Sequence, residues 1–426
     1  MNFSKKDFSI LIGNALDHFD TALYGFLAPL MGPIFFPHHD PVVQLILAYS
    51  IMATSIITRP LGALLFGIMA RSRGPLVGLS YSLIGVAIGT MCIGCLPGYD
   101  LIGWLAPLLL IMVRMVRGVC AAGESTIAKL YIMEGKTNHH ALKASYYYET
   151  SSMVGTIFAS CMVAAGLYFP GMGNWWRICF LTGGITGIAG YYLRMVACAK
   201  DDIHIKQFQY APLRMSEVWH HKANMLRVAV VTGSSYITYA IPFIFMNSFV
   251  PLVSSISFET MMALNTGLLV FDLLLIPIVG RYVVHYNPQR VLVVSALILA
   301  CTIVPLFYGL TNATVGYVLF VRIWIVFWGV VFMCPTNIWK KGLFPNGDSY
   351  LLVGLGAAFG ASTIGRMMTA VCLLLWYATA SCLAPAIYIA GIMGAAAYAV
   401  VSSDSKIGIY VLEQGIELYR SLEDQQ

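Results

Sequence analysis

Charged residues are scarce in this chain of 426 residues. Asp, Glu, Lys and Arg make up 10% of it, whereas soluble domains hold about 25%. Hydrophobic residues supply 59%, and the mean hydropathy is +0.77. Apolar stretches of about 18 residues or more recur from end to end. The scarcity of charge excludes a soluble protein and predicts a polytopic helical membrane protein.

Short alternating strands are also lacking. An outer-membrane barrel would show alternating segments of about 10 residues, and their absence from the sequence leaves an all-α fold. A cleavable signal peptide is not evident, because the polar start Met1–Asp7 leads straight into a long apolar span without a small-x-small site. The ten cysteines lie mostly within apolar segments, which is typical of packing residues rather than disulfides.

No catalytic constellation is found in the sequence. HExxH, a phosphate-binding loop and a Ser/His/Asp order are all missing, so we expect neither an enzyme nor a cofactor. The glycine-rich run 354–360 lies within an apolar span, where small residues let helices approach closely. Three histidine pairs fall in expected loops, where solvation is the ordinary state and a metal site is not expected: His38-His39, His139-His140 and His220-His221.

Twelve apolar spans are expected, separated by turn signals rich in Pro, Gly and Asn. The prediction is therefore an all-α polytopic membrane protein with twelve transmembrane helices. The spans lie near residues 9–36, 41–70, 75–96, 101–133, 142–169, 175–197, 226–254, 259–284, 289–309, 313–340, 350–378 and 382–402.

Basic residues follow one side of this topology. With the N-terminus in the cytoplasm, nineteen of the 25 Lys and Arg fall at cytoplasmic ends, in cytoplasmic loops or in the tail. Five others lie within spans, and Arg177 alone lies at an outer membrane edge. This bias predicts that both termini are cytoplasmic. Because the net charge of +6 follows the topology, it does not indicate binding to nucleic acid.

The longest internal polar stretch, Ala199 to Asn224, divides the spans six and six. We expect an N-terminal half at 1–198, a linker at 199–224, a C-terminal half at 225–403 and a cytoplasmic tail at 404–426. The tail contains a short amphipathic segment suited to the membrane surface. Two pseudo-twofold six-helix halves are typical of a secondary transporter with its substrate site between them.

Two aspartates interrupt the first span. An ionised carboxylate at the centre of a membrane helix costs roughly 2.5–3.5 kcal/mol, which favours a functional reason for Asp17 and Asp20. They are three residues apart and share one helix face. We expect one or both to carry a coupling proton, with Asp20 the better candidate because it is deeper. Alternatively, both lie at the interface, or Asp20 is a permanent partner of an arginine.

At this point the residues resemble a known family. The run GNALDHFDTALYG at 13–25 is similar to the G-N-x-[LM]-E-[WF]-[YF]-D-F-x-[LI]-Y-G opening of the metabolite:proton symporters. This branch of the major facilitator superfamily includes proline/betaine, α-ketoglutarate, citrate and shikimate carriers. Three further segments match in order and with family spacing: RPLGALLFG at 59–67, RMVRG at 114–118 followed by Gly123-Glu124 and Glu134, and Trp176-Arg177 followed by Arg194.

The resemblance implies a major facilitator fold, import driven by protons, and a monomer. It rests on the first half, since the second fits by topology alone. One motif departs from the superfamily: in the loop after the second span, Arg71 replaces the acid of G-x-x-x-D-R-x-G-R-[RK], and Val284 replaces it in the second copy. That acid normally holds helix ends together, so the departure concerns gating. The gating candidates are Arg71, Arg117, Glu134 and Glu149.

Two arginines lie deep in the first half. Arg59 is close to the midplane and Arg114 is similarly deep in the fourth span. A buried guanidinium must pair, and its planar fork suits a carboxylate. We expect Arg59 to bind a substrate carboxylate and Arg114 to pair with Asp20. The alternative is that both form structural ion pairs.

Two other charged residues of the fourth span, Glu124 and Arg117, each have more than one possible role. Glu124 completes the proton-coupling candidates with Asp17, Asp20 and Arg114, although a structural cap or gate fits it as well. Arg117 could pair with either Asp17 or Glu124.

Within its apolar spans, the second half contains one acid, Asp272, and two arginines, Arg322 and Arg366. This composition predicts one balanced pair and a spare cation for an anionic substrate group. An aromatic cage for a quaternary amine is the alternative, and it could include Tyr24. The substrate-binding candidates are Arg59, Tyr24, Asp272, Arg322 and Arg366.

The sequence thus predicts a proton-coupled symporter that imports a small carboxylated or zwitterionic metabolite by alternating access, in the inner membrane of a bacterium. Its partners would be the metabolite, protons and the bilayer. An exporter or antiporter of the same fold and a non-transporting ligand sensor are the alternatives. The identity of the substrate and the proton stoichiometry are left open.

Overall fold

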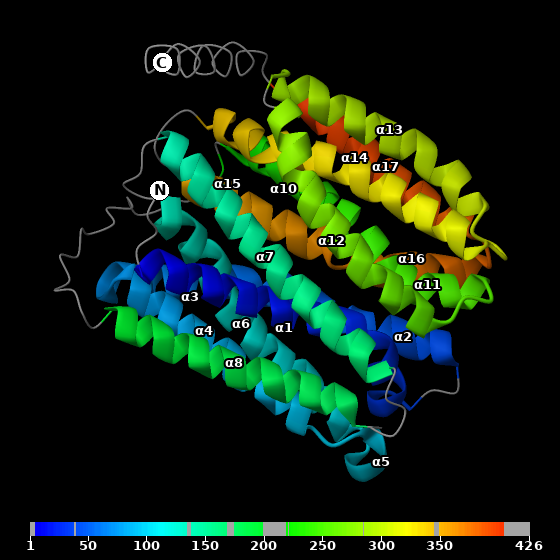
Figure 1. Cartoon of the computed structure of the whole chain (residues 1–426), viewed down its shortest axis with the longest axis horizontal. Coiled ribbons are helices and arrows are strands. Elements are labelled where there is room, and N and C mark those ends of the chain that lie inside the picture. The colour runs from blue at the N-terminus through cyan, green and yellow to red at the C-terminus, as the bar shows by residue number, and fades with distance from the viewer. Residues whose placement is uncertain are drawn as a thin grey trace. The chain divides into compact units, whose positions relative to one another are not determined.

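The computed structural model describes residues 5–37, 40–133, 138–167, 174–198, 219, 221–283, 285–344 and 349–403. Every regular element in these ranges is a helix (Figure 1). Glu134, the side chain of Arg71, nearly all of the linker 199–224 and the tail 404–426 lie outside the described residues. The expectations placed on them stay predictions.

The first six predicted spans correspond to eight α-helices and one 3-10 turn, η1. Their bounds are α1 (Lys5–Phe35), α2 (Pro41–Ser50), η1 (Ile51–Thr54), α3 (Ser55–Arg73), α4 (Pro75–Cys95), α5 (Tyr99–Ile102), α6 (Leu105–Met133), α7 (Asn138–Leu167) and α8 (Trp175–Cys198).

The last six correspond to α10 (Lys222–Ala240), η2 (Ile241–Phe245), α11 (Met246–Val253), α12 (Phe258–Val283), α13 (Pro288–Tyr308), α14 (Val315–Gly342), α15 (Ser349–Gly360), η3 (Ala361–Gly365), α16 (Met368–Thr379) and α17 (Leu383–Val401). Ten of the twelve predicted spans are long and apolar enough to cross a membrane, within the described ranges. The other two are the continuous helices α1 and α8. The all-α polytopic fold is confirmed.

Turn chemistry explains several helix boundaries. The Asp40 side chain accepts from the backbone N–H of Val42 at 2.8 Å, with Pro41 in the first turn of α2. Asn287 caps α13 in the same way through the N–H of Gln289, at 2.9 Å. Such caps satisfy backbone donors that have no partner within the helix. Between α3 and α4, Gly74 has φ +95°, which lets the chain reverse within one residue.

Two spans of the second half contain a π-helical segment. In the first, η2 carries Pro242, which lacks the N–H of a regular helix. In the second, η3 ends directly before Arg366. Such segments are rare and recur at functional sites.

The chain forms two compact units. The first comprises residues 1–209 with 247–251 and 256–270. In it, α1 packs on α7 and α8, and α4 packs on α6 and α8. Hydrogen bonds connect segments 247–251 and 256–270 to the rest of this unit. Asn265 Nδ2 donates to Ser160 Oγ at 3.2 Å, and the Tyr49 and Ser248 hydroxyls lie 2.7 Å apart. In the second unit, α13 lies beside both α14 and α17, and α10 packs on α15 (Figure 1).

Candidate functional site: buried charges within the helices

Asp20 of α1 forms a buried ion pair with Arg117 of α6. The Nε and Nη2 atoms of Arg117 both contact Oδ2 of Asp20, and Nη2 also donates to Thr21 Oγ1 at 3.0 Å. Asp20 is 2% exposed and Arg117 4% exposed. Oδ1 of Asp20 is buried and has no hydrogen bond in the part of the chain that is described. The Thr90 side chain lies beside this carboxyl as well. Arg114 also interacts electrostatically with Asp20, and the expectation that the two form a pair stays a prediction.

Arg114, one helical turn away on α6, lies instead on an aromatic ring. Its guanidinium carbon is 3.8 Å from the ring centre of Tyr24, a cation–π contact. The Tyr24 hydroxyl donates to the carbonyl of Ala48 at 2.7 Å, and the side chain is fully buried. The ring of Tyr24 thus orients Arg114.

Glu124 of α6 pairs with Arg194 of α8. Two hydrogen bonds of 2.9 and 2.8 Å join the guanidinium to the two carboxylate oxygens, and Nη1 also donates to the carbonyl of Leu79 at 2.9 Å. Both residues are 0% exposed. The geometry is the bidentate one that arginine favours.

Arg194 was assigned from the sequence only to the cytoplasmic end of its span, so its role as the partner of Glu124 was missed. The one signal was its place in the family's Trp-Arg…Leu-Arg pattern. For Arg117 the structure describes an ion pair with Asp20, and the expected choice between Asp17 and Glu124 stays a prediction.

Asn14 and Asp17 lie one turn before this region on α1. The Nδ2 atom of Asn14 lies 2.9 Å from the carbonyl of Tyr148 and within 2.8 Å of the hydroxyls of Ser151 and Ser152. Asp17 is 3% exposed, and its Oδ1 atom has no hydrogen bond within the described residues. Residues with such an unpartnered buried carboxyl are candidates for function.

The remaining candidates of the first unit lie apart from these pairs. Arg59 occupies a half-buried position on α3, and Glu149 a half-buried position on α7 beside Tyr148. The structure leaves their predicted roles untested.

In the second unit, Asp272 of α12 is 5% exposed and Arg322 of α14 is fully buried. Arg366, directly after η3, is half-buried, with its guanidinium carbon 5.7 Å from the ring centre of Tyr236. Among the described residues no ion pair joins Asp272 to either arginine. Asp272 is therefore buried without an ion pair in this part of the chain, and the roles expected of the three residues stay predictions.

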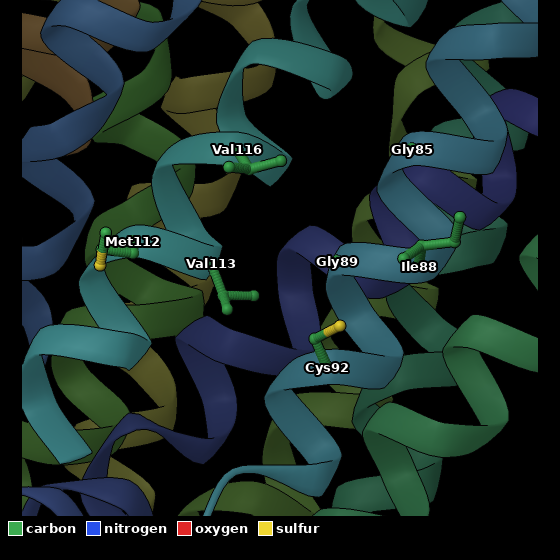
Figure 2. A pocket seen from close by; sticks show the side chains of 7 residues that line it. All are labelled: Gly85, Ile88, Gly89, Cys92, Met112, Val113 and Val116. Carbon is green, nitrogen blue, oxygen red and sulfur yellow. The ribbon is translucent and has the colours of Figure 1, made fainter. Parts of the chain in front are cut away.

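A cavity of about 390 Å³ lies between α4 and α6 (Figure 2). It is lined by Gly85, Ile88, Gly89, Cys92, Met112, Val113 and Val116. These side chains offer no charge or strong hydrogen-bonding group, so the cavity fits neither a carboxylate nor a proton. No group of three or more His, Cys, Asp or Glu able to hold a metal ion is found in the described ranges.

Helices long enough to cross a membrane, with ion pairs buried between them, define a polytopic helical membrane protein. Residues 7–197 match the family model described as "Sugar (and other) transporter". The resemblance to the major facilitator superfamily is confirmed, by sequence over these residues and by fold over most of the chain.

Several bacterial transporters are similar to the first half. The proline/betaine transporter of Escherichia coli K12 is 34% identical over 187 residues, which are 43% of this chain and 37% of that protein. The glycine betaine/proline/ectoine/pipecolic acid transporter OusA of Dickeya dadantii is 32% identical over 187 residues, which are again 43% of this chain and 37% of that protein. A putative proline/betaine transporter of Staphylococcus haemolyticus is 35% identical over 195 residues, 45% of this chain and 42% of that protein. The matched stretch thus spans less than half of each relative.

Solved structures share the fold over nearly the whole chain. A D-xylose–proton symporter superposes with a TM-score of 0.76 at 13% identity, covering 95% of this chain and 98% of its own. A partially occluded inward-open conformation of the xylose transporter XylE from E. coli gives 0.69 at 15% identity, covering 93% and 96%. At such identities the likeness shows the fold alone.

Proposed function

We propose that this chain is a proton-coupled symporter that imports a small carboxylated or zwitterionic metabolite by alternating access, in the inner membrane of a bacterium. The ion pair between Asp20 and Arg117 is the observation that carries the proposal. It joins α1 to α6, it is buried, and one oxygen of its carboxylate has no hydrogen bond within the described residues.

Proton binding at Asp20 would release Arg117. A protonated carboxyl loses its charge, and the Coulomb attraction that makes a buried pair favourable is then lost. Arg117 is left as a buried cation without its counter-ion, a state that favours rearrangement of α6 against α1. Loss of the proton restores the pair. This is the two-state element that coupling between a proton gradient and a conformational change requires.

The relatives suggest the substrate class. Their names include proline and betaine, which carry a carboxylate and a cationic nitrogen. We assign carboxylate binding to arginines, with Arg59, Arg322 and Arg366 as the candidates, because a guanidinium fork matches a carboxylate. Asp272 is the candidate for the cationic nitrogen, because it is a buried acid with no ion pair among the described residues.

Transport by purified protein in proteoliposomes tests the proposal. Labelled proline and glycine betaine should accumulate when the outside is acidic, and a protonophore should abolish the accumulation. Counterflow at equal pH should persist, since exchange needs no net proton movement. Accumulation driven only by the opposite gradient would identify an exporter. Substrate binding without any flux would identify a sensor, and either result would contradict the proposal.

A further inference from the structure

Two buried oxygen atoms on α1 lack a hydrogen-bond donor. They are Oδ1 of Asn14 and Oδ1 of Asp17, in side chains that are 0% and 3% exposed. The residues are three apart, so their side chains share one face of the helix. Buried polar atoms without a partner are costly and rare. Two such acceptors on one helix face indicate a hydrogen-bond donor that both of them share.

The orientation of Asn14 is fixed by α7. Its Nδ2 atom donates to the Ser151 and Ser152 hydroxyl oxygens, at 2.7 and 2.8 Å, and lies 2.9 Å from the carbonyl of Tyr148. The protons of both serine hydroxyls go to that same carbonyl, at 2.7 and 3.2 Å. Exchanging the amide atoms would set the Asn14 oxygen against the Tyr148 carbonyl. Asn14 therefore points its oxygen away from these groups, and neither serine proton is available to it.

The neighbouring cations are engaged elsewhere. From α6, Arg117 is bound by Asp20 and Arg114 lies on the ring of Tyr24. From α8, Arg194 is bound by Glu124 and by a backbone carbonyl. Two titratable groups interact electrostatically with Asp17, namely Asp20 on α1 and Tyr148 on α7. His18 is its neighbour in the sequence, and Glu124 and Glu149 interact with the same Tyr148. The salt bridges described for Arg117 and Arg194 are with Asp20 and Glu124, not with Asp17.

We propose that Asn14 and Asp17 form a second proton-binding site, in which a proton carried by the Asp17 carboxyl is shared with Oδ1 of Asn14. A carboxylate only accepts hydrogen bonds, whereas a protonated carboxyl also donates one. A single proton thus satisfies both oxygens. A hard metal ion is the competing occupant, but such ions take about six or more oxygen ligands. The serine oxygens here already accept from Asn14.

The role of this site in transport rests on the proposed function. In a symporter, Asp17 would bind one proton in addition to that carried by Asp20. Its existence can be tested without any substrate, however, so the two ideas can fail separately.

Infrared spectroscopy of the purified full-length protein tests the site directly. The wild type should show the carbonyl band of a protonated carboxyl at neutral pH, and Asp17→Asn should remove it. Asp20→Asn should leave this band, because the proposal assigns the proton to Asp17 and not to Asp20. The matched control is Asp100→Asn, a change at an exposed acid of α5, which should also leave the band.

A second variant, Asn14→Ala, keeps the test decisive if Asp17→Asn misfolds. Asn14→Ala keeps the acid but removes the acceptor, so the band should persist and move to the higher frequency of a carbonyl whose proton is not shared. A wild-type spectrum without a protonated carboxyl at neutral pH, or a band unchanged in both variants, overturns the proposal. It is also overturned if the band is missing and sodium chloride, but not choline chloride, raises the melting temperature of the wild type.

Discussion

Arg194 donates hydrogen bonds to both carboxylate oxygens of Glu124, whereas Arg117 contacts only one carboxylate oxygen of Asp20. Both pairs are buried and both involve α6. The first pair leaves neither oxygen of its acid free. The second leaves Oδ1 of Asp20 without a hydrogen bond in the described part of the chain. This difference supports a structural role for the Glu124–Arg194 pair and the proposed proton-binding role of Asp20.

Glu124→Gln should destabilise the fold strongly. Removing one partner of a buried ion pair leaves an uncompensated charge and costs about 3–5 kcal/mol. Unfolding of the purified protein, followed by circular dichroism, measures the change. The double variant Glu124→Gln/Arg194→Met should recover part of the loss because it removes the orphaned cation. A Glu124→Gln protein as stable as the wild type contradicts the structural role.

Gly13→Ala should also weaken this pair. A β-carbon at position 13 would lie 2.9 Å from Oε1 of Glu124 and even closer to the guanidinium of Arg194. The matched control is Gly67→Ala on α3, where an added β-carbon meets nothing within 4 Å. Alanine is a better helix former than glycine by about 1 kcal/mol. We expect Gly67→Ala to raise the melting temperature slightly and Gly13→Ala to lower it.

Asp20→Asn should abolish proton-driven accumulation and spare counterflow. Asparagine cannot exchange a proton, and the neutral side chain mimics the loaded state. Uptake by proteoliposomes, with and without an acidic outside, measures the difference. Asp100→Asn should behave as the wild type in both assays. Accumulation that survives Asp20→Asn removes this residue from the coupling step.

The partner of Asp20 shows where prediction from the sequence stops. Arg114 and Arg117 are three residues apart, so both project from a similar face of α6. Sequence depth favoured Arg114. Packing adds a second arginine: Arg117 contacts Asp20 and Thr21, while the ring of Tyr24 lies against Arg114. A sequence gives the face of a helix, whereas the choice between neighbours one turn apart depends on the rotation of the facing helix.

The helical spans were predictable because each is a long apolar stretch bounded by turn residues. The breaks within them were not. The span at 41–70 contains the 3-10 turn η1, and the span at 350–378 contains η3. Neither Ile51–Thr54 nor Ala361–Gly365 holds a proline. These irregular turns depend on tertiary packing that no local pattern records.

Tyr24→Phe and Tyr24→Ala should separate the two contacts of this residue. Phenylalanine keeps the ring beneath Arg114 but loses the hydrogen bond to Ala48, a loss of about 1 kcal/mol. Alanine loses the ring as well and leaves a cavity, for which buried aromatics cost about 3–5 kcal/mol. Chemical unfolding of the two variants measures both steps. Equal stability of the two variants would show that the ring does not support Arg114.

Asp272→Asn should distinguish substrates by their nitrogen. If Asp272 binds the cationic group of a zwitterion, its loss removes a charged contact of about 1.5–3 kcal/mol. The half-saturating concentration of glycine betaine in counterflow should then rise roughly tenfold or more. A transported carboxylate without a cationic nitrogen should be unaffected. Glu259→Gln is the matched control, because Glu259 is an exposed acid in the first turn of the same helix, α12. An equal loss for both substrate classes would assign Asp272 to the fold, since a structural defect does not discriminate between ligands.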